Sequence, residues 1–394
     1  MRTWIGRKKL AFLPVHRLNA QPPDEPVPAD WPSEILRRVL FDPTPPTGAD
    51  RSLRAYIQAA SSGQADLDAV VLPMQVIDRQ DVPPNAFEAQ FGAQLREQGF
   101  DAAALVMLGG PGAGTAESVG GFWARFVMAE GLGVWAMELI HCLASIDDLY
   151  TFGGNMGGFE EMAGALGTHP SAYTKSIAGW LDVSAITRHT NHTAAVTYNL
   201  HAIGLVQPPP TGRVGAVRIG SQVPYLMVEA RLMNDQFDAQ IPAPGVIVYR
   251  VQTSSPQGTA QNQTMPLQLL TLKSDGKPTA LNVGQSFTAG DLKVKVVKAL
   301  SGGFSISVDD SLKAIGFVTS YESERVDPDR PPGPSNPVIQ TIEIDSKPGF
   351  IFTATGGPSF AATVKNAQKN HRKVEITFTS TGPNSGKIVS VKLK

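Results

Sequence analysis

Residues 135–150, Trp135-Ala-Met-Glu-Leu-Ile-His-Cys-Leu-Ala-Ser-Ile-Asp-Asp-Leu-Tyr150, decide the fold of this chain. The apolar residues here and just before predict a helix over 133–145 that carries Glu138 and His141. On a helix, positions 137 and 141 lie one turn apart on the same face, with Glu138 beside them. Two interpretations follow: a core helix with a satisfied His–Glu pair, or a helix that contributes to a metal centre.

The spacing of these residues is close to the one that a zinc peptidase uses. Such an enzyme has histidine ligands at the two helix positions, a glutamate as general base, and a third ligand further along the chain. Glu138 and His141 fit, and Asp147 stands six residues after His141, where the third ligand is expected. Position 137, where the first histidine is expected, holds methionine. The motif is therefore degenerate.

Several collinear segments resemble the immune-inhibitor-A-like zinc metallopeptidases, a family of metzincin-type zincins. The family pattern HExxHxxGxxD stands here as Met137-Glu-Leu-Ile-His141-Cys-Leu-Ala144-Ser-Ile-Asp147. Gly158-Phe-Glu-Glu-Met162-Ala-Gly164 is similar to the family's Met-turn, which implies that Met162 packs beneath the metal site without binding the metal. The likeness covers residues 9–310, and its other segments are Arg54–Asp68, Lys175–Leu181, Pro224–Arg231 and Pro244–Arg250.

Two departures from the family pattern affect the expected chemistry. Met137 offers a soft, neutral thioether, whereas zinc is best bound by imidazole, carboxylate or thiolate. Only His141 and Asp147 then remain of three protein ligands. Ala144 replaces the glycine that lets the family's chain turn towards the third ligand, and a positive φ there would cost alanine about 1 kcal/mol. Together the two changes indicate a site released from catalysis.

The resemblance implies an α+β zincin-like metallopeptidase domain over residues 1–187. After it, short alternating runs separated by turn residues predict a β-sandwich over 188–320. The proline-rich segment 321–337 is typical of a stiff linker. Alternation resumes over 338–394 and predicts a small β-module. The expected fold class is thus a zincin-like domain followed by all-β modules.

Composition excludes several classes of protein. Of 394 residues, 42% are hydrophobic and 18% charged, which excludes a disordered chain, and a net charge of −1 gives no strong nucleic-acid signal. The single cysteine, Cys142, excludes an intrachain disulfide scaffold, and we expect it to lie in the core. No apolar run is long enough to span a membrane. The last module is locally basic, with seven Lys or Arg against one acid over 361–394.

The compartment stays open. The family suggests a secreted protein. The chain starts with a basic segment, but Leu10–Leu13 is too short for the apolar part of a signal peptide, and one cysteine also permits the cytoplasm.

Three hypotheses for function remain. The first is a zincin-fold pseudoprotease that acts as a binding, structural or assembly component, with no cofactor or a weakly bound zinc ion and an unidentified protein or glycan partner. The second is an active, secreted zinc endopeptidase with one zinc ion, in which Glu138 is the general base. The third is a carbohydrate- or surface-binding protein that acts through its β-modules.

Overall fold

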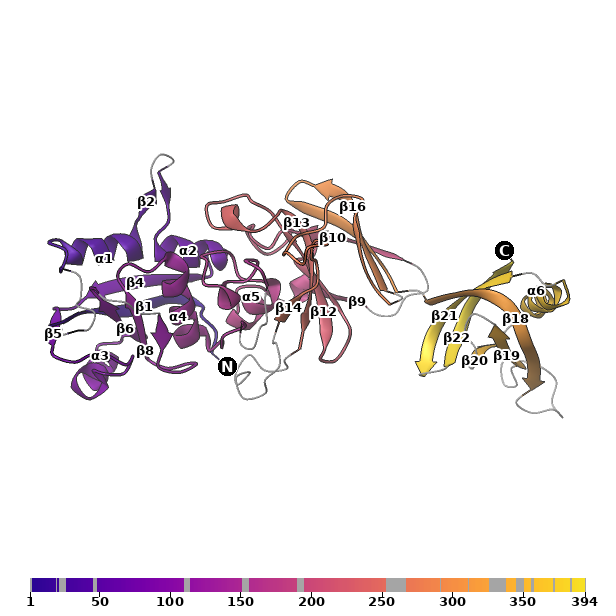
Figure 1. Cartoon of the computed structure of the whole chain (residues 1–394), viewed down its shortest axis with the longest axis horizontal. Helices are drawn as coiled ribbons and strands as arrows, with labels where there is room; N and C mark the ends of the chain where they lie inside the picture. Colours follow the sequence, from indigo (N-terminus) through magenta and orange to yellow (C-terminus); the bar gives the residue numbers. More distant parts are fainter. Residues whose placement is uncertain are drawn as a thin grey trace. The chain divides into compact units, whose positions relative to one another are not determined.

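The computed structural model describes most of the chain (Figure 1). It describes residues 2–18, 20, 26–44, 48–109, 114–150, 156–189, 195–252, 267–290, 292–310, 312–325, 338–344, 351–355, 358–370, 373–382 and 385–393. The chain divides into two compact units. The first holds residues 1–189, 199–285 and 296–305, and the second holds 190–198, 286–295 and 306–394.

The first unit begins with a mostly parallel sheet in the order β4-β1-β6-β8-β7. Strands β4, β1, β6 and β8 run parallel, whereas the short strand β7 is antiparallel to β8 at the edge. Every residue of β6 is buried, as its unbroken apolar sequence predicts for a strand covered on both faces. The strands are β1 (Gly6–Arg17), β4 (Ala65–Val71), β5 (Gln75–Ile77, beside β1), β6 (Ala102–Met107), β7 (Thr115–Ala116) and β8 (Trp123–Val127).

Helices cover both faces of this sheet. Alternate residues of β1 belong to two different cores, because successive side chains of a strand point to opposite faces. Leu10 and Phe12 pack with the helices α1, α2 and α4, and Ala11 and Leu13 pack on the side of α3 (Figure 1). These elements are α1 (Trp31–Leu40), α2 (Leu53–Ala60), η1 (Glu88–Gly92), α3 (Ala93–Glu97) and α4 (Leu132–Ala144), and the small hairpin β2 (Pro43–Thr44) and β3 (Ala49–Asp50) precedes α2.

A second sheet of the same unit has the order β14-β13-β12-β11-β9. Its neighbours are antiparallel except β9 and β11, which are parallel. Its inner residues Met227, Ile247 and Tyr249 belong to the same buried cluster as Trp135 of α4. The predicted boundary at 187 therefore does not separate two cores. The elements here are η3 (Glu161–Ala163), α5 (Ala172–Ala178), η4 (Val183–Ala185), β9 (Ile186–His189), β11 (Ala216–Ile219), β12 (Tyr225–Arg231), η5 (Asp238–Gln240), β13 (Gly245–Val251) and β14 (Leu267–Leu269).

The strands predicted over 188–320 are thus divided between this sheet, another open sheet and, from Leu312, the barrel. The other sheet has the order β10-β17-β16-β15 and contributes strand segments to both units. Its strands are β10 (Val196–His201), β15 (Ser286–Ala289), β16 (Leu292–Leu300) and β17 (Gly303–Asp309).

The C-terminal part of the second unit is a closed barrel in the order β18-β19-β20-β22-β21. It begins at Leu312, before the predicted boundary at 338, because β18 pairs with both β19 and β21. The first five residues of the predicted linker belong to β18, and 326–337 lie outside the described residues. The elements are β18 (Leu312–Arg325), β19 (Val338–Ile344), β20 (Ile351–Thr355), α6 (Pro358–Lys369), β21 (Lys373–Gly382) and β22 (Ser385–Leu393).

In the part of the chain that the structure describes, no helix combines the length and the apolar character needed to cross a membrane.

Candidate functional site

Helix α4 places the candidate site residues in the interior of the first unit. Nearly all of its residues are buried, so it packs on every side and carries Glu138 and His141 into the core. The helix begins after Gly131, whose backbone is extended. Gly133 allows close packing, since a Cβ there would overlap the backbone of Ala165 and Gly167. The segment that follows the Met162 turn therefore lies directly against the start of α4.

The chain leaves α4 one residue later than the family pattern implies. Ala144 is the last helical residue, and the left-handed conformation falls on Ser145, with φ 55° and ψ 43°. Alanine has the highest helix propensity, whereas glycine at that place would favour an end to the helix. The amide of Gly120 donates to the carbonyl of His141 at 2.8 Å, and a Cβ on Gly120 would lie 2.8 Å from Ser145 Oγ. The loop before β8 therefore packs against this turn.

The later turn brings Asp148 to His141. His141 Nε2 lies 3.1 Å from Asp148 Oδ1, and Nδ1 lies 2.5 Å from the carbonyl oxygen of Ile146. A carbonyl only accepts, so Nδ1 carries a hydrogen, and Nε2 needs one to bond the carboxylate. With both nitrogens protonated, the ring is an imidazolium that forms an ion pair with Asp148. Burial disfavours the charged ring, but the hydrogen bond and charge of Asp148, the charge of Glu138 and the carbonyl of Ile146 together outweigh burial and raise the pKa of His141.

Glu138 lies beside this pair in a nearly closed environment. Its exposed fraction is 6%, and a Cβ on Gly114, just before edge strand β7, would lie 2.9 Å from Glu138 Cγ. Burial, with help from the negative charge of Asp148, raises the pKa of Glu138 to about 7, although the charge of His141 acts in the opposite direction. A carboxyl group with a pKa near neutrality is suited to accept and release a proton.

The other predicted site residues take different places. Met137 is 4% exposed and belongs, with Met162, to the apolar core. Met162 lies on η3, and its carbonyl accepts a hydrogen bond from the amide of Leu149, which follows Asp148, at 2.8 Å. Met162 is thus a packing residue under the turn. Asp147 Oδ1 accepts from the amide of Asp148 at 2.9 Å, so it caps the turn.

The structure brings together Glu138, His141 and Asp148, and the sequence motif missed the last of these. The signal that could have found it is the doubled acid at 147–148 together with Ala144, which extends the helix by one residue.

The residues present do not fit a catalytic zinc ion. Two ligands of a tetrahedral zinc at about 2.0–2.2 Å stand about 3.3–3.6 Å apart, so the 3.1 Å between His141 Nε2 and Asp148 Oδ1 is close to the spacing of one such pair. A catalytic site needs a third protein ligand, and Met137 offers only a thioether. Among the described residues, no group of three His, Cys, Asp or Glu side chains could hold a metal ion.

Cys142 is a core residue, as the sequence predicts. It is fully buried, its Sγ lies 3.5 Å from the carbonyl oxygen of Trp123, and burial raises its thiol pKa to about 12. The thiol therefore stays protonated and unreactive at neutral pH.

The sequence did not predict a buried cluster of charges that is centred on Arg231 of β12. Its guanidinium bonds both oxygens of Asp238, at 2.7 and 3.2 Å, and lies 3.5 Å from Glu229. It also donates to the carbonyls of Phe159 and His169. We call these five residues the Arg231 cluster. It fastens Phe159 and His169, which lie on the two sides of Met162 in the sequence, to β12 of the second sheet.

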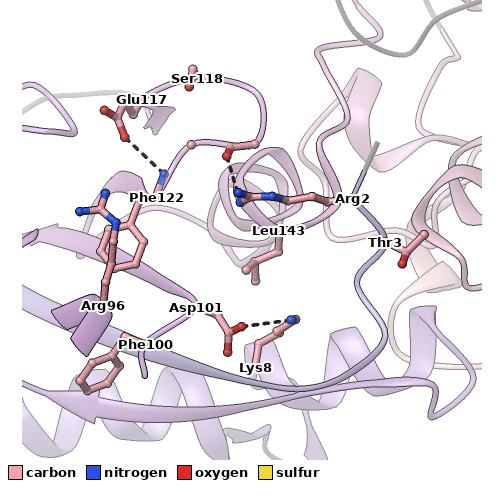
Figure 2. A pocket seen from close by; sticks show the side chains of 12 residues that line it. Arg2, Thr3, Lys8, Arg96, Phe100, Asp101, Glu117, Ser118, Phe122 and Leu143 are labelled. Atoms are coloured by element: carbon pink, nitrogen blue, oxygen red, sulfur yellow. Dashed lines mark hydrogen bonds and ion pairs between the residues drawn. The ribbon is translucent and has the colours of Figure 1, made fainter. Parts of the chain in front are cut away.

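A large polar hollow of about 830 Å³ opens near the end of α4, beside Leu143 (Figure 2). Its basic side chains are already paired. Lys8 forms an ion pair with Asp101 at 3.0 Å, and Arg2 donates to the carbonyl of Gly120 at 3.1 Å. Arg96 lies over the ring of Phe122 and pairs with Glu88 outside the hollow. Glu117 of the same hollow accepts a hydrogen bond from the amide of Phe122 at 3.3 Å, so each of these charged side chains already has a partner among the described residues.

Comparison with known proteins adds no assignment: no family model matches the chain, and no curated protein matches it.

Proposed function

We propose that this chain is a zincin-fold pseudoprotease, in which the former peptidase centre is retained as structure and the protein acts through binding or assembly. The proposal rests on one observation: both ring nitrogens of His141 are occupied, by Ile146 and by Asp148. A metal ligand needs a free imidazole lone pair. With Nδ1 bonded to Ile146 and a protonated Nε2 paired with Asp148, the ring has none to offer until that Nε2 proton is lost.

The rest of the site supports the same conclusion. With a thioether at Met137 and an imidazolium at His141, Asp148 is left as the single anionic ligand close to the ring. A metal held this weakly does not generate a bound hydroxide at neutral pH. Glu138 keeps a pKa of about 7, but has no activated water to deprotonate. Its burial beside the ion pair is compatible with a structural role.

A second candidate, an active zinc endopeptidase with Glu138 as general base, is favoured by two features. The 3.1 Å between His141 Nε2 and Asp148 Oδ1 is close to the spacing of two ligands of one zinc ion, and the pKa of Glu138 suits a base. It requires a third ligand from outside this set and loss of the proton on His141 Nε2, while Nδ1 keeps its hydrogen bond to the carbonyl of Ile146.

Zinc content separates the two candidates. We expect the full chain, dialysed against zinc at pH 7.5 and measured by native mass spectrometry, to carry no stoichiometric zinc and to leave casein intact. Met137→His should bind about one zinc ion per chain, with affinity that rises with pH because metal must displace a proton from His141. Met137→Leu, which keeps the volume without a ligand, is the matched control. One zinc per parent chain, with casein cleavage that Glu138→Ala abolishes, would overturn the proposal.

A further inference from the structure

A second pocket lies against the edge of the β14-β13-β12-β11-β9 sheet, away from α4. Its volume is about 220 Å³, and α5, η4 and the strands β9, β11 and β12 form it. We call it the β9–β11 pocket. It is lined by Tyr173, Ser176, Val183, Ile186, Arg188, Arg218, Tyr225 and Met227.

Two arginines stand side by side in this pocket. Arg188 of β9 and Arg218 of β11 are register partners in the parallel pair. Like charges on directly neighbouring strand positions repel each other, so the arrangement costs stability unless an anion lies between them. None of the residues that line the pocket is acidic. In the hollow of Figure 2, by contrast, the basic Lys8 faces its own acid.

Arg218 is held in one conformation. Its guanidinium stacks 3.8 Å from the ring centre of Tyr225, Nε donates to the carbonyl of Gly220 at 3.1 Å, and Nη2 donates to that of Ser221 at 2.8 Å. Nη1 has no such contact among the described residues. A fixed guanidinium loses little entropy when it binds a ligand, which favours affinity.

Arg188, unlike Arg218, is free to move towards a ligand. The side chain is exposed, and it forms no hydrogen bond or ion pair with any described residue. Its planar fork can therefore bind two oxygens of one anion at once. The pocket also has an apolar part, because Met227 forms a buried floor and Val183, 73% exposed, stands at the rim.

From this juxtaposition we propose that the β9–β11 pocket binds an oxyanion, held between Arg188 and Arg218, whose attached body lies on Met227 and Val183. The shared chemistry is a tetrahedral or planar oxyanion: phosphate, sulfate or carboxylate. This site is independent of the zinc question, since none of its residues belongs to α4 or the turn after it.

The test is isothermal titration of the full chain with inorganic phosphate, with inorganic sulfate, and with a sulfated disaccharide. We expect saturable binding with a Kd on the order of 1 mM for the free ions. Arg188→Gln and Arg218→Gln should each weaken binding about tenfold or more, because each removes a charge-assisted hydrogen bond. Arg188→Lys should keep part of the affinity, since it retains charge without the fork.

Arg96→Gln, in the hollow of Figure 2, is the matched control for net charge, and we expect unchanged binding. Tighter binding of the disaccharide than of inorganic sulfate is expected if the attached body lies on Met227 and Val183, and equal binding would overturn that part of the proposal and leave a site for the free ion. The proposal fails if no probe saturates by about 20 mM, or if Arg96→Gln weakens binding as much as Arg188→Gln does. Thermal unfolding of each variant verifies that it is folded.

Discussion

The Arg231 cluster predicts that one arginine carries a large share of the stability of the first unit. In Arg231→Met the side chain keeps most of its volume but loses two bonds to Asp238, the contact with Glu229 at 3.5 Å and two bonds to carbonyls. Asp238 and Glu229 are both fully buried, so their carboxyl groups stay in the interior without the cation.

The expected cost is about 3–5 kcal/mol, the usual cost of removing one partner of a buried ion pair. Since a domain is stable by about 5–15 kcal/mol in total, this loss should be easy to measure. Arg250→Met is the matched control on the neighbouring strand β13. Arg250 is half-buried and donates one bond to Gln268 at 3.3 Å, so the control should cost less than about 1 kcal/mol.

The assay is urea unfolding followed by tryptophan fluorescence. All five tryptophans, Trp4, Trp31, Trp123, Trp135 and Trp180, lie in the first unit, so the signal reports on that unit. Adding Asp238→Asn to Arg231→Met should cost about 1–3 kcal/mol less than the sum of the single changes, because the isolated carboxylate is gone. If Arg231→Met and Arg250→Met cost the same within about 1 kcal/mol, the cluster does not fasten Phe159 and His169 to the second sheet and the reasoning is refuted.

Two further predictions concern α4. Gly133→Ala should lower the free energy of unfolding by about 1–3 kcal/mol in the same assay, because its Cβ would overlap the backbone of Ala165. This loss is expected despite the better helix propensity of alanine. Gly131→Ala, whose Cβ meets open space, is the control, and equal losses for the two variants would contradict the packing argument. Burial raises the folded-state pKa of Glu138 to about 7, so the parent loses stability between pH 4.5 and about 7. Glu138→Gln does not ionise. Its stability relative to the parent should therefore rise over this range by about 3 kcal/mol and stay level above it. A variant-minus-parent difference that is the same at pH 5 and pH 8 would rule this out.

The parts of the fold that the sequence could predict are those with long local patterns. The helix expected over 133–145 is α4 at Leu132–Ala144, and the apolar run Ala102–Met107 forms the buried strand β6. Both are unbroken apolar runs, whose burial does not depend on one distant partner. The boundary at 187 failed to mark a separate core, because Trp135 and Tyr249 share one buried cluster and no local signal encodes that contact.

The candidate site divides in the same way. Glu138 and His141 follow from helical spacing, and the structure places both in the interior. The Arg231 cluster could not be predicted from the sequence, because Arg231 bonds to the carbonyl of Phe159, 72 positions away, and belongs to no motif. The β9–β11 pocket could not be predicted for the same reason, because Arg188 and Arg218 become neighbours only when β9 and β11 pair.

Ala144 and Met137 both disfavour metal binding at His141, each in a different way. Under the proposed function, Met137 replaces a histidine ligand on one face of α4. Ala144 extends the helix, so that the left-handed turn moves to Ser145 and Asp148 arrives opposite His141 Nε2. The histidine is then neutralised by an acid of its own chain, and the carbonyl of Ile146 takes the remaining ring nitrogen. A buried imidazolium paired with Asp148 needs no metal to balance its charge, so α4 can keep Glu138 and His141 in the core although position 137 holds no histidine.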